Sequence, residues 1–407
     1  MSAPLPRTVK ALGFVSLLTD VSSEMIYPLL PAFLTGPLRA GPALLGAIEG
    51  LAESIASLVK IGSGYLSDRL GRRKLLIVIG YGLSSMVRPL VALATAASHV
   101  LAIRVLDRLG KGVRGAPRDA LVAEVTPEGD RGRAFGFQRA MDHTGALVGP
   151  LLAAAILFVR DDLRLVFALA AVPAIAAMLF VVFGVAEDAP KPKPAAGSTV
   201  RLARSPITRD GKAPPLPGSL QRYLLVLAVF TLGNSSDAFL LLRAQEAGIG
   251  LAALPLLWSL HHLVKSAVST WGGTLSDRLG RRATILAGWG VYAVAYAGFA
   301  WAQTPGQIWG LFAFYGLFHA LTEGPERALV SDLASNEAQG RAFGYFHAVT
   351  GVMLLPASLL TGFLWQQYGA AIALYTGAGL AGVAALLLLL LVPERSRTIR
   401  EAGVPSS

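Results

Sequence analysis

The sequence predicts an all-α membrane protein, with twelve transmembrane helices arranged as two six-helix bundles around a central cavity. Three observations predict this fold class: an apolar composition, regularly spaced apolar stretches and an internal repeat. Hydrophobic residue types make up 54% of the 407 residues and charged types 15%, whereas soluble domains carry roughly a quarter charged residues. Such a composition is typical of a chain whose surroundings are largely lipid.

Twelve stretches are candidates for crossing a bilayer, whose hydrocarbon core needs ~20 helical residues. They are residues 10–34, 43–66, 75–96, 98–123, 135–158, 165–186, 221–243, 252–275, 284–303, 307–332, 342–366 and 371–392. A segment rich in proline, glycine and positive charge follows the sixth stretch and predicts a flexible linker. We therefore expect four parts: an N-terminal bundle (1–187), a cytoplasmic linker (188–220), a C-terminal bundle (221–393) and a cytoplasmic tail (394–407).

The basic residues predict the orientation of the chain. The formal net charge is +11, and most Lys and Arg residues of the predicted loops fall on one side of the membrane if the N-terminus is cytoplasmic, as the positive-inside rule requires. We expect a multi-pass protein of the cytoplasmic (inner) membrane with both termini in the cytoplasm. Because these charges lie in short loops between apolar stretches, the lipid bilayer is the expected partner and nucleic acid is not. The chain has no cysteine, which excludes disulfides, thiolate metal sites and cysteine nucleophiles.

The two halves of the chain carry the same motifs. The octet LSDRLGRR occurs at 66–73 and again at 275–282, and GRAFGF at 132–137 returns as GRAFGY at 340–345. Two motifs that recur at nearly one offset indicate a duplicated unit. Parallel six-helix repeats with a cavity between them are the plan of many secondary transporters.

The longer segments GYLSDRLGRRK (64–74) and GGTLSDRLGRR (272–282) resemble the loop signature of the major facilitator superfamily. The resemblance implies a monomeric transporter, not an enzyme, that moves a small-molecule substrate by alternating access without a cofactor. In this family the acid of the loop faces a helix N-terminus of the opposite half, so the loops would act as a conformational latch. The latch residues would be Gly64, Asp68, Arg72, Gly273, Asp277 and Arg281, with the glycines allowing a neighbouring helix to come close. The simpler alternative is that the arginines only hold the loops in the cytoplasm.

The stretch GALVGPLLA (145–153) resembles a second pattern of the family, which is associated with antiporters that export. Its defining residues here are Gly145, Gly149 and Pro150, although alanine stands at positions 153 and 154, where glycine is usual. The alternative interpretation is a seam of small residues that lets two helices pack around a proline kink.

Ionisable residues inside the predicted helices form one polar stripe per helix. Charges at mid-membrane are costly and must face water or protein, so the stripes predict a hydrated central pathway. The candidate proton-coupling or substrate-binding residues are Asp20, Glu24, Glu49, Glu53, Arg104, Arg108, Lys111, Asp142, Asp237, His262, His319 and Glu323.

Glu24 and Asp237 occupy corresponding positions when VSSEM is aligned with NSSDA. Burial disfavours the charged form of a carboxylate, so two acids in matching mid-membrane places are candidates for proton carriers. The alternative is that the acids merely neutralise the arginines of residues 98–123.

The stretch RVLDRLGKG (104–112) resembles a family motif that links one buried arginine, here Arg104, with proton transfer. Arg108 stands where glycine is common, and with Lys111 it could attract an anion, since guanidinium groups suit carboxylate and phosphate. The same cations could instead be neutralised by Asp20, Glu49, Glu53 and Asp119, which we favour.

The leading hypothesis is a proton-coupled efflux transporter. Uptake of an anionic metabolite by symport and export of a divalent metal ion stay open as alternatives, since histidines and acids share the polar stripes. No tight ligand spacing such as HExxH is present, and we expect no bound metal. Outside transport, the alternative is a membrane enzyme or sensor, but no phosphate loop and no serine–histidine–acid motif occur.

Overall fold

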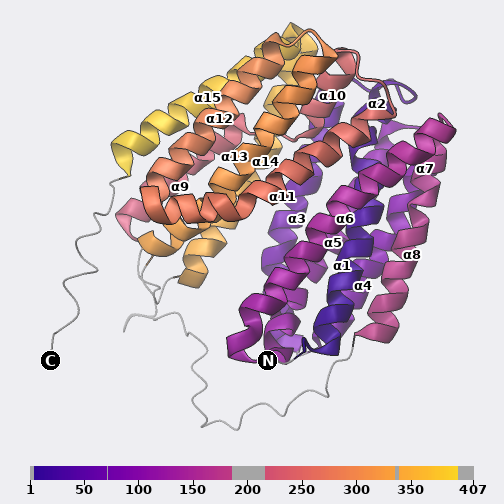
Figure 1. The fold of residues 1–407 in the computed structure, drawn as a ribbon, viewed down its shortest axis with the longest axis vertical. Coiled ribbons are helices and arrows are strands. Elements are labelled where there is room, and N and C mark those ends of the chain that lie inside the picture. The colour runs from indigo at the N-terminus through magenta and orange to yellow at the C-terminus, as the bar shows by residue number, and fades with distance from the viewer. Residues whose placement is uncertain (1–3, 71, 186–215, 335–338, 393–407) are drawn as a thin grey trace.

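The computed structural model describes residues 4–70, 72–185, 216–334 and 339–392. These residues form twelve helical passes and no strand (Figure 1). The predicted fold class is therefore confirmed. The predicted linker at 188–220 lies mostly, and the predicted tail at 394–407 entirely, outside the described residues.

The N-terminal bundle is drawn from indigo to magenta in Figure 1. Its helices are α1 (Arg7–Ile26), α2 (Leu30–Thr35), α3 (Pro42–Leu70), α4 (Arg73–Val87), α5 (Ala97–Val125), α6 (Arg131–Val159), α7 (Leu163–Leu169) and α8 (Ala171–Leu179). Short turns extend four of them: η1 (Tyr27–Leu29), η2 (Arg88–Leu93), η3 (Glu128–Asp130) and η4 (Phe180–Gly184). The first pass is broken between α1 and α2 because Pro28 and Pro31 lack the N–H that a continuous helix needs.

The C-terminal bundle, drawn from pink to yellow, repeats this plan. Its helices are α9 (Gly218–Gly233), α10 (Ala238–Glu246), α11 (Ala253–Leu279), α12 (Arg281–Trp301), α13 (Pro305–Leu333), α14 (Gln339–Tyr368) and α15 (Ala370–Leu391). Gly280 joins α11 to α12 with a φ of 96°, a conformation that glycine adopts without the steric cost other residues would meet. The glycine of the repeated octet therefore makes the sharp turn between two membrane helices.

Seven passes within the described part of the chain are long and apolar enough to cross a membrane by length and composition alone. They are Arg73–Leu93, Arg131–Val159, Leu163–Gly184, Gly218–Glu246, Arg281–Trp301, Gln339–Tyr368 and Ala370–Leu391. The remaining passes run through α1, α3, α5, α11 and α13, which carry most of the predicted polar stripes. Their low apolar content follows from the ionisable residues that they place inside the protein.

The two bundles touch along a seam between α3 and α14. A Cβ on Gly46 would meet the Ser358 carbonyl oxygen at 2.2 Å, and one on Gly351 would meet the Ser57 Cβ at 2.3 Å, so these helices are in backbone contact. The Ser54 hydroxyl also donates a 2.7 Å hydrogen bond to the Gly351 carbonyl. The bundles meet near α2 and α10 and diverge toward the end of the molecule that carries the N-terminus (Figure 1).

Candidate functional site

Helix α5 carries a ladder of buried ion pairs inside the N-terminal bundle. Arg104 binds Glu49 of α3 through two hydrogen bonds of 2.9 and 2.6 Å, with Glu49 only 1% exposed. One turn along, Arg108 lies 2.7 Å from Glu53. Asp107, on the same face, accepts a 2.7 Å hydrogen bond from Arg88. Paired acids and guanidinium groups of this kind satisfy one another inside a protein.

The ladder shows which charges neutralise each other. Glu49 and Glu53 pair with Arg104 and Arg108, and Arg118 pairs with its neighbour Asp119 at 3.0 Å. Asp20 was also expected to help neutralise these arginines. This expectation is wrong for direct contacts, because no ion pair among the described residues involves Asp20. Lys111 is exposed although it lies between the buried residues Arg108 and Arg114, and its charge acts on Asp20 and Glu53.

Asp20 and Glu24 lie where α1 packs against α6. A Cβ on Gly145 would come within 2.9 Å of the Asp20 Cβ, and one on Gly149 within 3.1 Å of the Glu24 Cβ. The small residues of the GALVGP stretch therefore bring α6 directly against the acidic face of α1, and Pro150 lies buried in the same helix. Asp142 of α6 also acts electrostatically on Asp20, and its Oδ1 is buried without a hydrogen-bond partner.

Glu24 makes a contact that joins the two bundles. Its Oε2 accepts a 2.8 Å hydrogen bond from the indole N–H of Trp258 on α11. Next to it, the rings of Tyr27 and Trp258 lie 5.2 Å apart, and the Tyr27 and Ser236 hydroxyls lie 3.4 Å apart. Within the described part of the chain, no cation lies within ion-pair distance of Glu24.

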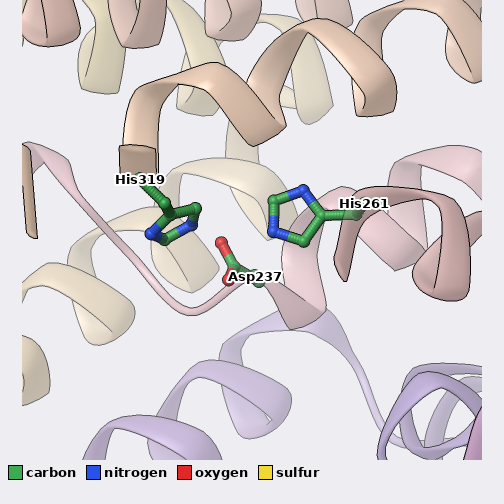
Figure 2. Close-up of side chains that lie close together, drawn as sticks. All are labelled: Asp237, His261 and His319. Atoms are coloured by element: carbon green, nitrogen blue, oxygen red, sulfur yellow. The ribbon is translucent and has the colours of Figure 1, made fainter. Parts of the chain in front are cut away.

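The C-terminal bundle places Asp237 in a break between helices. Residues 234–237 separate α9 from α10, and the Asp237 Oδ1 accepts a 2.8 Å hydrogen bond from the hydroxyl of Tyr315 on α13. His261 of α11 and His319 of α13 point toward the same carboxylate from two sides (Figure 2). One ligand atom from each of Asp237, His261 and His319 lies within 4.8 Å of the others.

A second group follows on the same helices. Lys265 of α11 lies 2.6 Å from Glu323 of α13, and the Nδ1 of His319 lies 3.6 Å from the same carboxylate. His262 meets the Trp258 ring edge to face at 4.9 Å. Both of its ring nitrogens are buried without a hydrogen-bond partner.

Three residues at the site were not singled out from the sequence: Arg88, Trp258 and Tyr315. His261 was expected only as one of the histidines of the polar stripes. Polarity singles out ionisable residues, but Trp258 and Tyr315 look like ordinary apolar positions in a membrane helix. A signal exists for Trp258, because it stands three residues before His261 and so shares its helix face. Arg88 lies in the turn η2 after α4, where the sequence shows no polar stripe.

The second of the repeated loops makes ion pairs within the C-terminal bundle. Asp277 pairs with Arg281 of its own bundle, which also lies 3.5 Å from Asp332 on α13. The side chain of Asp68 lies outside the described residues, and Arg72 is exposed.

The close approach expected at Gly273 is also wrong. A Cβ on Gly273 would meet nothing within 4 Å, whereas one on Gly272 would come within 1.9 Å of the Ala320 carbonyl oxygen. The reason is the helical rotation of 100° per residue, which turns Gly272 toward α13 and Gly273 away from it. In the first half, a Cβ on Gly64 would be in ordinary contact, 3.4 Å from the Ala116 Cβ.

Two bundles of membrane helices with ionisable groups between them define a transporter that spans the membrane many times. The family model of the Major Facilitator Superfamily matches residues 12–264 and 223–405, and the chain belongs to this superfamily. It is 36% identical over 392 residues to an uncharacterized MFS-type transporter of Methanocaldococcus jannaschii, which covers 95% of each chain. It is 27% identical over 363 residues to the multidrug resistance protein MdtG of Enterobacter lignolyticus, covering 86% of this chain and 84% of the other.

Solved structures show the same fold. A nucleoside transporter structure matches with a TM-score of 0.76 at 14% identity, covering 95% of this chain and all of the other (100%). A peptide transporter in complex with sulfate matches with a TM-score of 0.75 at 15% identity, covering 95% of this chain and 94% of the other. At these identities the likeness concerns the fold and leaves the substrate open.

Proposed function

We propose that this protein exports a small molecule across the cytoplasmic membrane by alternating access, and that a proton carried by Glu24 drives the cycle. The observation that carries the proposal is the hydrogen bond from Trp258 of one bundle to Glu24 of the other. Both bundles belong to one chain, so the mechanism needs only a monomer. Protonation of Glu24 would change the free energy of a contact between the two parts that must move.

The other acids near Glu24 are less suited to this role. Glu49 and Glu53 are held by Arg104 and Arg108, and an acid paired with a guanidinium group gives up its charge reluctantly. The pairing also supports export over uptake of an anionic metabolite, because the guanidinium group of Arg108, which could attract an anion, is already bound to Glu53.

The size of the effect suits a switch. A hydrogen bond to an ionised group contributes about 1.5–3 kcal/mol, and one between neutral groups about 0.5–1.5 kcal/mol. The ionised carboxylate therefore favours the observed arrangement of the bundles by roughly 1 kcal/mol more than the neutral acid does. A proton that crosses 100 mV gains about 2.3 kcal/mol, which is enough to drive this difference.

The direction of transport is proposed from the open end. The bundles diverge toward the end where the N-terminus and the loop between α11 and α12 lie (Figure 1). The helix ends beside that loop carry Arg278, Arg281 and Arg282, so the positive-inside rule places this end in the cytoplasm. The substrate would load from the cytoplasm while Glu24 is ionised. The names of the multidrug resistance relatives support efflux.

The absence of cysteine allows a direct test with spin labels. Tyr65 of α3 and Tyr345 of α14 are both exposed and lie on opposite bundles beyond the seam, at the open end. In the protein labelled at Tyr65→Cys and Tyr345→Cys, lowering the pH from 8 to 5 is expected to shorten the label separation measured by double electron–electron resonance. The reason is that protonated Glu24 releases the Trp258 contact. The Glu24→Gln variant should show the short separation at every pH.

Glu326→Gln is the matched control, because Glu326 also accepts an indole hydrogen bond, from Trp289 at 3.1 Å, but inside one bundle. It should respond to pH like the unmodified protein. If Glu24→Gln kept the full pH response, Glu24 would not be the switch. Proton-driven efflux itself is tested with fluorescent drugs in inverted membrane vesicles, where a protonophore or Glu24→Gln should abolish accumulation. Accumulation that survives both would refute the coupling.

A further inference from the structure

The cluster of Asp237, His261 and His319 has no role in the proton step described above. The three side chains come from the start of α10, from α11 and from α13, and their ligand atoms lie within 4.8 Å of one another. Figure 2 shows the two imidazole rings flanking the carboxylate. His261 is only 1% exposed, whereas Asp237 and His319 are half-buried.

Each histidine has one ring nitrogen with no hydrogen-bond partner. These are the Nδ1 of His261 and the Nε2 of His319. A buried polar atom without a partner is costly and needs a physical explanation. A neutral imidazole nitrogen without a proton offers the lone pair that a metal ion binds.

The opposite nitrogen of His319 lies beside a carboxylate, in the way that orients metal-binding histidines. The Nδ1 of His319 lies 3.6 Å from the Glu323 carboxylate. A proton shared with a carboxylate or carbonyl on one nitrogen fixes the tautomer that leaves the other nitrogen free. The Nε2 of His319, which faces the Asp237 carboxylate in Figure 2, is thereby left free to bind a metal ion.

Asp237 is oriented in the same manner. The Tyr315 hydroxyl donates to its Oδ1 at 2.8 Å, and a carboxylate has further lone pairs for a second partner. Tyr315 also stacks on His261, with ring centroids 5.2 Å apart. One tyrosine therefore restrains two members of the cluster.

We propose that Asp237, His261 and His319 bind one divalent transition-metal ion, of the class of Zn²⁺ and Co²⁺. Two imidazoles and one carboxylate favour these ions over Mg²⁺ and Ca²⁺, which prefer all-oxygen ligands. Three protein ligands leave a fourth position for water or another small ligand. Bonds of about 2.0–2.1 Å in a tetrahedron place ligand atoms about 3.4 Å apart, so the side chains must move together by about 1.4 Å at most.

The site is independent of the proton-coupled cycle. All three ligands belong to the C-terminal bundle, so an ion binds whichever way the two bundles are placed. Replacing Glu24 should therefore leave metal binding unchanged, and failure of the transport proposal would not remove the metal site.

The test is a titration of the purified full-length protein, without a polyhistidine tag, with Co²⁺ followed by visible absorption. We expect one Co²⁺ per chain, displaced by one Zn²⁺. His261→Gln and His319→Gln should each weaken binding at least about 100-fold, and Glu323→Gln, which removes only the orienting carboxylate, about 10- to 100-fold. His347→Gln, which removes a histidine of α14 in the same bundle, should bind as the unmodified protein does.

The unmodified protein alone can overturn the proposal, so folding of the variants does not limit the test. Absence of saturable Co²⁺ binding below about millimolar concentration would do so. The proposal would also be overturned if His261→Gln and His319→Gln left Co²⁺ binding intact. It would equally be overturned if His347→Gln weakened Co²⁺ binding as much as they do. Asp237→Asn preserves size and shape and should weaken binding while the melting temperature stays within a few degrees.

Discussion

The two bundles share one fold but fill corresponding positions with different chemistry. At the offset of 208 that aligns PRDALVAEV with PERALVSDL, Arg104, Asp107 and Lys111 of α5 correspond to Phe312, Tyr315 and His319 of α13. At the offset of 209 set by the repeated octet, Glu49 and Glu53 of α3 correspond to Trp258 and His262 of α11. Charged pairs in the first half are thus replaced by aromatic rings and histidines in the second.

The difference teaches which features a duplicated transporter retains. Helix order and the sharp loops with their arginines are common to both halves. The interior of the N-terminal bundle is held by ion pairs, whereas the interior of the C-terminal bundle is held by stacked rings such as Phe230 on Trp289 at 4.4 Å and Tyr292 on Tyr296 at 4.0 Å. Glu24 and Trp258 connect these two environments.

The largest effect is expected where the ion-pair ladder is broken. Glu49→Gln removes the carboxylate that binds the buried guanidinium group of Arg104 and leaves only Asp107 at 3.9 Å, which should lower the free energy of unfolding by about 3–5 kcal/mol. The double variant Glu49→Trp with Arg104→Phe copies the residues of the C-terminal bundle and should recover most of this loss, because a packed apolar pair needs no partner. Denaturant titration in detergent measures both. A single variant as stable as the unmodified protein would contradict the assigned role of the pair.

A smaller effect is expected where the two halves pack differently. Gly272 corresponds to Ser63, whose hydroxyl donates a 2.8 Å hydrogen bond to the Gly112 carbonyl. Copying the serine into the second half with Gly272→Ser forces a Cβ against the Ala320 backbone and should cost about 1–3 kcal/mol. Gly273→Ala is the matched control and should be neutral or slightly stabilising, since its Cβ meets nothing within 4 Å. Equal melting temperatures for the two variants would show that the packing difference is not real.

The smallest effect is expected at the repeated loops. Arg73 pairs with Glu124 of α5, and Arg281 pairs with Asp277 and Asp332, all with partly exposed side chains. Exposed ion pairs contribute about 0–1 kcal/mol, so Arg73→Gln and Arg281→Gln should each change the free energy of unfolding by no more than about 1 kcal/mol. A loss of several kcal/mol in either variant would mean that the loop is a structural support.

The sequence predicts the fold and the polar faces of the helices, but it does not predict which side chains pair with each other. The spacing of apolar stretches and the repeated octet predict twelve passes in two halves, because bilayer thickness and duplication leave direct traces in the chain. Helical periodicity places Glu49, Glu53, Arg104 and Arg108 on polar faces, yet it cannot say which face meets which. Those pairings depend on the rotation of each helix about its axis. For this reason the close helix approach expected at Gly273 occurs at Gly272 instead.

Glu24, whose hydrogen bond joins the two bundles, illustrates the same limit. Glu24 stands out in the sequence because a charge in an apolar helix is costly. Its partner Trp258 carries no charge, so no rule of charge balance could select it. The contact between α3 and α14 likewise joins segments of different halves, which no short-range pattern records.

The glycine seam between α3 and α14 determines how far other residues move when one bundle rocks against the other. Glycines there face backbone or small serine side chains, so no large interlocked side chains must be released before one bundle turns against the other. Tyr65 lies eight residues past Ser57 on α3, or about 12 Å at a rise of 1.5 Å per residue. A turn of about 10° at Ser57 would carry Tyr65 sideways by about 2 Å, and residues farther along the helix would travel proportionally farther.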